Sequence, residues 1–168
     1  MTCTSAGSGI GVKSFHAPTH LWANESADEG KATRMKVLAD GRQFITKVSG
    51  VPVTASPISN AVVVGGTCWI SGQLSVADDG QYQAGTARQE AERAFELVFR
   101  IAAAAGFGSA DIVYVDIAFD DLNDLPAINE LYAELFEADR RPARTVYQAA
   151  RLPFGGKVKV QAVAARGQ

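Results

Sequence analysis

Two amphipathic helical stripes are interleaved with six strand-like runs between residues 42 and 168 of this 168-residue chain. The ratio of two helices to six strands constrains the fold, because two helices can cover only one face of a six-stranded sheet. We therefore predict an α+β domain with a six-stranded mixed sheet and two helices on one face. The opposite face would stay wet unless another subunit covered it, so an oligomer is expected.

The first helix is predicted to follow Thr86. The Thr86 hydroxyl and the Gln89 side chain, three residues later, have the form of a capping box. Small and apolar residues then recur every three or four positions as far as Gly106, which supplies the stop. A second helical stripe follows a predicted cap at Asn123 or Asp124.

The strand-like runs are rich in β-branched and aromatic residues, as strands are. One run is divided by Gly65-Gly66, a dipeptide that supplies the positive φ angles of a tight hairpin turn. The six predicted strands come from Phe44–Val48, the hairpin Asn60–Gln73, Asp111–Phe119, Ala143–Ala150 and Lys157–Ala165.

Residues 1–41 are rich in Ser, Gly, Thr and Ala and show no sustained period, so they are predicted to form a flexible N-terminal extension to the domain at 42–168. Met35 lies shortly before the first strand-like run, and we hypothesise that translation starts there. His16 and His20 have the spacing of metal ligands, but a proline separates them and no carboxylate or Cys accompanies them. No metal site is expected.

The charge balance, 16 Lys and Arg against 18 Asp and Glu, gives a net charge of -2 and no footprint for binding nucleic acid. No run approaches the ~20 apolar residues of a membrane span, and the first residues lack the basic and apolar regions of a secretory signal. Cys3 and Cys68 lie far apart, and Cys68 is predicted to be a small core residue. A cytoplasmic location is expected.

Arg144 is the candidate ligand-binding residue. In the run PARTVYQA a proline precedes the strand, and alternation places Arg144 and Val146 on one face. A guanidinium at the start of an apolar strand needs a partner, because an unpaired buried charge is very costly. That partner is either a protein carboxylate or a ligand carboxylate, which the planar guanidinium grips through two hydrogen bonds.

Several blocks of sequence together resemble one family. They are SPISNAVVVGGTCWISGQL, AERAFELVFRIAAAAGF, DIVYVDIAFDDLNDLPAINELYAELF, RPARTVYQAARLP and VKVQAVA, within the range Phe44 to Ala164. The most specific part is PAR followed by ARLP after an N-E-x-Y helix. The chain resembles the YjgF/RidA family, also called the L-PSP endoribonuclease-like family.

The resemblance implies a chorismate-mutase-like fold and homotrimers with ligand clefts between subunits. It also implies hydrolysis of reactive enamine or imine intermediates of amino acids, which releases a 2-keto acid and ammonia without metal or cofactor. By the same resemblance, Arg144 binds the substrate carboxylate, the backbone of Val146 helps to hold it, and Gly72 lines the cleft.

Two positions depart from the family pattern. Gln161 stands where deaminating members carry a glutamate that orients the attacking water, and Ile58 stands where a tyrosine commonly follows the proline of the first loop. Gln161 can position a water by hydrogen bonds but cannot take a proton. Ile58 makes that wall of the cleft apolar, which favours a larger or less polar substrate.

Three functions are consistent with these residues. The leading one is a deaminase that acts on a carboxylate-bearing imine or enamine. The second is a non-catalytic protein that binds a small carboxylate, because Gln161 and Ile58 are altered. The third is a ribonuclease, although no histidine lies between residues 42 and 168 to act as acid or base. The basis of this third function is a local basic cluster of Arg140, Arg141, Arg144 and Arg151.

Overall fold

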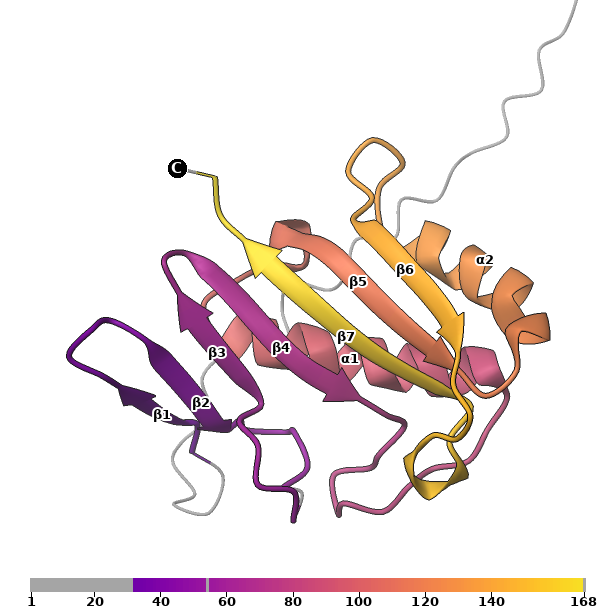
Figure 1. The fold of residues 1–168 in the computed structure, drawn as a ribbon, viewed down its shortest axis with the longest axis horizontal. Helices are drawn as coiled ribbons and strands as arrows, with labels where there is room; N and C mark the ends of the chain where they lie inside the picture. The colour runs from indigo at the N-terminus through magenta and orange to yellow at the C-terminus, as the bar shows by residue number, and fades with distance from the viewer. Residues whose placement is uncertain (1–31, 54, 168) are drawn as a thin grey trace, which may run out of the picture.

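The computed structural model describes residues 32–53 and 55–167. The predictions made for His16, His20 and Cys3 therefore lie outside the described residues. Within the described part, one layer is a mixed sheet of seven strands and the other layer holds helices α1 and α2 (Figure 1).

The strands follow the order β1-β2-β3-β4-β7-β5-β6 across the sheet. Neighbours are antiparallel except β5 and β6, which are parallel because helix α2 connects them as a crossover. The strand bounds are β1 Arg34–Val37, β2 Gln43–Lys47, β3 Ala61–Val64, β4 Thr67–Gln73, β5 Ile112–Phe119, β6 Ala143–Gln148 and β7 Val158–Ala165.

The seventh strand corrects the predicted count of six. The additional strand is β1, which pairs antiparallel with β2 at the edge of the sheet and lies inside the segment assigned to a flexible extension. All four of its residues are exposed. Its four residues, Arg-Met-Lys-Val, alternate polar and apolar side chains, but the run is short and buries no side chain, so it was not separated from the extension. Met35 lies in this strand, and the translation start there stays a prediction.

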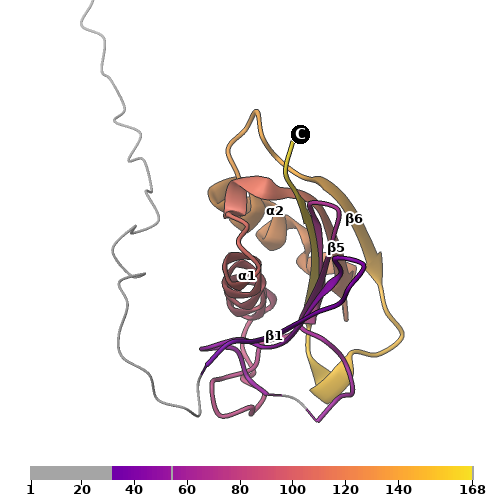
Figure 2. The same ribbon diagram turned by 90° about the vertical axis from the view of Figure 1, so that its left-hand side faces the viewer.

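Both helices lie on one face of the sheet, as predicted (Figure 2). Helix α1, Ala87–Ala104, begins with the predicted capping box: the Thr86 hydroxyl accepts from the Gln89 N–H at 3.2 Å, and the Gln89 side chain accepts from the Thr86 N–H at 3.0 Å. The turn that ends it contains Gly106 at φ +84°. Helix α2 is Leu125–Leu135, with Asp124 at the N-cap position.

The core lies between the helices and the sheet. The Phe95 ring of α1 packs edge-on against the rings of Tyr132 and Phe136, with centroids 6.2 and 6.1 Å away. Cys68 is fully buried, as predicted, and burial raises the pKa of its thiol to about 11. Among the described residues, no helix is long and apolar enough to cross a membrane.

The other face of the sheet is uncovered in the single chain (Figure 2). Trp69 lies on it, since its neighbours Cys68 and Ile70 are both buried against the helices and side chains alternate along a strand. More than half of the Trp69 side chain is exposed, and Val62 and Val163 lie opposite it on the adjacent strands. This is the sheet face for which the ratio of helices to strands predicts a covering subunit.

Candidate active site

Arg144 lies near the start of β6, at the edge of the sheet, and its side chain reaches α2. One guanidinium N–H donates to the Asn129 side-chain oxygen at 2.7 Å, and the guanidinium carbon lies 4.6 Å from the centroid of the Tyr132 ring. The side chain is half-buried. In the described residues the hydrogen-bond acceptor of Arg144 is thus a neutral amide, and the alternative of a protein carboxylate partner is not realised.

The Arg144 side chain lines a surface pocket of about 420 Å³ between α2 and β6, which we call the α2–β6 pocket. None of the residues that line it carries a carboxylate. They are Asn129, Tyr132, Ala133, Arg141, Pro142 and Arg144.

The Tyr132 phenol forms one wall of this pocket. It donates to the Pro142 carbonyl at 3.1 Å, which ties the end of α2 to the start of β6. Burial raises the pKa of Tyr132 to about 12, while the positive charges of Arg144 and Arg141 act in the opposite direction. The phenol is therefore neutral at physiological pH, and the pocket carries a net positive charge.

Val146 lies two residues after Arg144 on the same face of β6 and packs against the core. The Ala149 N–H donates inward to the Phe119 carbonyl at 2.8 Å. Because successive N–H groups of a strand alternate in direction, the N–H of Val146 points outward at the free edge of the sheet. Arg144 and Val146 therefore lie on one face of β6, as strand alternation predicts, and their joint role in holding a ligand stays a prediction.

Gly72 lies in β4, and the side chain of Lys159 from β7 passes directly over it. A Cβ at residue 72 would collide with the end of the Lys159 side chain, so a larger residue there would require Lys159 to move. Nothing in the sequence pattern singled out Lys159, although its spacing of two from Gln161 on a strand places both side chains on one face.

Gln161 is exposed on β7, and its neighbours Val160 and Ala162 are fully buried. Its side chain therefore lies on the uncovered face of the sheet, whereas Arg144 lies on the helix face. Strand β5 also separates the two residues, with Asp116 opposite Gln161 and Val115 opposite Arg144. A single chain does not bring Arg144 and Gln161 together.

Ile58 lies in the loop before β3 and is largely exposed, and it does not line the α2–β6 pocket. The pocket residue that sequence reasoning missed is Asn129, and Arg141 was named only as part of the local basic cluster. Asn129 and Tyr132 are three residues apart in the N-E-x-Y run, and this spacing places both on one face of α2. That helical spacing was the available signal for the partner of Arg144.

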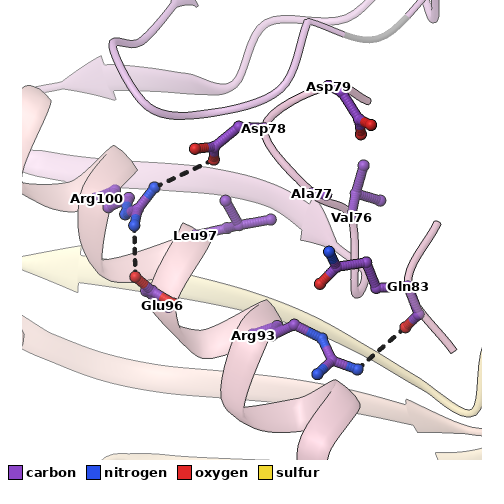
Figure 3. Close-up of a pocket in the computed structure, with 9 residues that line it drawn as sticks. All are labelled: Val76, Ala77, Asp78, Asp79, Gln83, Arg93, Glu96, Leu97 and Arg100. Atoms are coloured by element: carbon purple, nitrogen blue, oxygen red, sulfur yellow. Dashed lines mark hydrogen bonds and ion pairs between the residues drawn. The ribbon is translucent and has the colours of Figure 1, made fainter. Parts of the chain in front are cut away.

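A second pocket, of about 450 Å³, lies between α1 and the loop after β4, and we call it the α1 pocket (Figure 3). It also contains two arginines, but both are bonded to the protein. Arg100 donates to the Gly50 carbonyl at 2.6 Å and to Glu96 at 2.5 Å, and Arg93 donates to the Gln83 carbonyl at 3.1 Å. These two guanidinium groups stabilise contacts within the chain. Because their donors already have protein acceptors, fewer are left for a ligand.

The fold and the α2–β6 pocket define an α+β protein with a pocket at a sheet edge that is lined by two arginines and no carboxylate. Residues 49–166 match the family model described as Endoribonuclease L-PSP. The chain belongs to this family, which is the one its sequence resembles.

Known relatives agree with this assignment. A 2-iminobutanoate/2-iminopropanoate deaminase of Capra hircus is 36% identical over 124 residues, which cover 73% of this chain and 90% of the relative. The crystal structure of RidA from a Psychrobacter species is 32% identical, with a TM-score of 0.65, and the match covers 70% of this chain and 94% of that one. The crystal structure of E. coli TdcF with bound serine has the same identity and coverage and a TM-score of 0.64.

Proposed function

We propose that this protein hydrolyses reactive 2-imino acids, or their enamine tautomers, to 2-keto acids and ammonia. The observation that carries the proposal is the half-buried Arg144 guanidinium in a pocket without a carboxylate. A guanidinium has five N–H donors, and the bond to Asn129 uses one of them. The others remain for a ligand. The relative named as a 2-iminobutanoate/2-iminopropanoate deaminase supports the reaction type.

The substrate carboxylate is held by Arg144 and by the N–H of Val146 at the free edge of β6. A carboxylate accepts two parallel hydrogen bonds from a guanidinium, which fixes both its position and its plane. Asn129 orients Arg144 for this contact from the α2 side. The related TdcF structure with bound serine supports a ligand of amino-acid size with a carboxylate.

The reaction needs only water. The imine nitrogen is protonated, so its carbon is an electrophile, and the oxygen of a water molecule forms a bond to that carbon. One proton passes from the added water to the nitrogen, the carbon–nitrogen bond then breaks, and a second proton leaves the hydroxyl as the carbonyl forms. The nitrogen departs as ammonia, which takes up this second proton and becomes ammonium. Gln161 positions the water by hydrogen bonds and takes no proton itself.

Because Arg144 and Gln161 lie on opposite faces of the sheet, they act on one substrate only if two copies of the chain contribute. We propose the homotrimer implied by the family resemblance, with the uncovered sheet face at the subunit contact. Gly72, with Lys159 over it, and Ile58 then belong to the side of the cleft that carries Gln161. Exposed Trp69 is the kind of apolar surface that such a contact would bury.

The test is ammonia release, or semicarbazide trapping of the imine, with 2-aminoacrylate and 2-iminobutanoate generated in situ by a dehydratase or an amino-acid oxidase. Wild type is compared with Arg144→Ala and with a matched control, Arg140→Ala, since Arg140 is exposed and outside the pocket. The proposal expects acceleration in wild type and in the control and none in Arg144→Ala. A wild-type rate in Arg144→Ala would dismiss the site.

A second candidate function is a non-catalytic carboxylate-binding protein. The observation that favours it is Gln161, which cannot serve as a base. If wild type does not accelerate hydrolysis for any side chain, but keto or amino acids still bind in an Arg144-dependent manner, this function replaces the first. The cytoplasmic location expected from the sequence stays a prediction.

A further inference from the structure

A second guanidinium, that of Arg141, lines the α2–β6 pocket together with Arg144. Arg141 is exposed, and within residues 32–53 and 55–167 it forms no hydrogen bond or ion pair with a protein acceptor. Its side chain is therefore free to bond a ligand. By contrast, the arginines of the α1 pocket are bonded to carbonyls and carboxylates of the chain.

Arg141 and Arg144 are close enough to contact one small ligand in this pocket. The positive charges of Arg144 and Arg141 both reach the Tyr132 phenol, where they oppose the effect of burial on its pKa. Arg141 and Arg144 are three residues apart, so their Cα atoms are at most about 10 Å apart. Two arginine side chains can converge from that separation on a ligand of four or five carbons.

We propose that the substrate carries a second carboxylate, and that the α2–β6 pocket takes a four- or five-carbon 2-imino diacid. Arg144 holds the carboxylate beside the imine carbon, and Arg141 holds the carboxylate of the side chain. This inference rests on the proposed deamination and names the substrate class of the same site. The bonds that form and break are those of the reaction above, because the second carboxylate takes no part in it.

The charges of the pocket favour a diacid over an amide of the same size. A carboxylate pairs with the planar guanidinium of Arg141 through charge-assisted hydrogen bonds. A neutral side-chain amide offers one weaker acceptor and gains no charge attraction. Because Arg141 is exposed, salt should reduce the preference.

The experiment compares two imino acids that differ in one group. An amino-acid oxidase generates the imine of aspartate or the imine of asparagine in situ, and ammonia release gives kcat/KM for each. We expect wild type to prefer the aspartate-derived imine by about tenfold at low salt. We expect the preference to fall to about one in Arg141→Gln. The exposed residue Arg140 gives the matched control, Arg140→Gln, which should keep the wild-type preference.

The outcomes separate this inference from the proposed function. Equal kcat/KM for the two imines in wild type, or an unchanged preference in Arg141→Gln, would overturn the second-carboxylate inference and leave the deaminase in place. If no imine is hydrolysed, the proposed deaminase function is rejected. The second-carboxylate inference is then tested by calorimetric binding of 2-oxosuccinate and of its monoamide. The inference is supported if wild type binds the diacid about tenfold more tightly than the monoamide and if Arg141→Gln loses this preference. Equal binding of the two compounds by wild type would overturn it.

Discussion

The α1 pocket and the α2–β6 pocket are similar in size and each contains two arginines, but the arginines differ in what they bond. In the α1 pocket, Arg100 contacts a backbone carbonyl, Glu96 and Asp78, and Arg93 contacts Ser75 and the Gln83 carbonyl. In the α2–β6 pocket, Arg144 has one neutral acceptor. The role of an arginine in this chain therefore follows from the acceptors that the fold places around it.

The largest expected effect comes from Arg144→Ala. Removing two charge-assisted hydrogen bonds to the substrate, each worth about 1.5–3 kcal/mol, should lower kcat/KM for imine hydrolysis at least ~100-fold. Thermal unfolding should change little, because Asn129 is exposed and water can replace the lost bond. Steady-state kinetics and calorimetry check the two parts. A large loss of melting temperature would place Arg144 with the arginines of the α1 pocket.

A smaller effect is expected from Gln161→Glu, which tests whether the uncovered sheet face belongs to the site. If a base limits turnover, the new carboxylate should raise kcat on small imino acids by about tenfold, within the range of general-base assistance. Glutamine and glutamate have nearly the same shape, so the fold should be unaffected. An unchanged or lower kcat, measured with the same ammonia assay, would count against a role for residue 161 in water activation.

The reverse pattern is expected from Arg100→Ala. This change removes the bonds to the Gly50 carbonyl and to Glu96 and should lower the free energy of unfolding by about 1 kcal/mol. The value of kcat/KM should stay at the wild-type level. Urea denaturation and the ammonia assay together measure both quantities. A loss of activity without a loss of stability would show that the α1 pocket also binds substrate and would remove the contrast between the pockets.

The smallest effect at working pH concerns Tyr82 and Tyr132. Burial raises the pKa of each phenol to about 12, and the unfolded value is near the ordinary 10. Their neutral forms thus contribute stability that is complete below pH 10 and is lost as the pH rises toward 12. Melting temperature measured between pH 8 and 12 should fall only above about pH 10. In Arg144→Ala the Tyr132 absorbance titration should move to still higher pH, because one opposing positive charge is removed.

Much of the local structure was predictable from the sequence. The capping box at Thr86 and Gln89 depends on atoms three residues apart, and the turn at Gly65-Gly66 depends on two φ angles, which are +54° and +80° in the structure. The pairing of Arg144 with Val146 on one face follows from strand alternation. Helical spacing in the N-E-x-Y run places Asn129 and Tyr132 on one face of α2. Only the position of α2 beside β6 shows that Asn129 accepts a hydrogen bond from Arg144.

The sequence by itself determined the helices and six of the strands, because periodicity and capping act over a few residues, and it singled out Arg144 with its partner left open. The tertiary structure decided which face of the sheet each side chain occupies. Strand order and helix placement are long-range properties, and they put Arg144 and Gln161 on opposite faces. They also bury Glu90, whose carboxylate accepts from Tyr82, Gly85 and Lys157, three residues that meet it only in the folded chain.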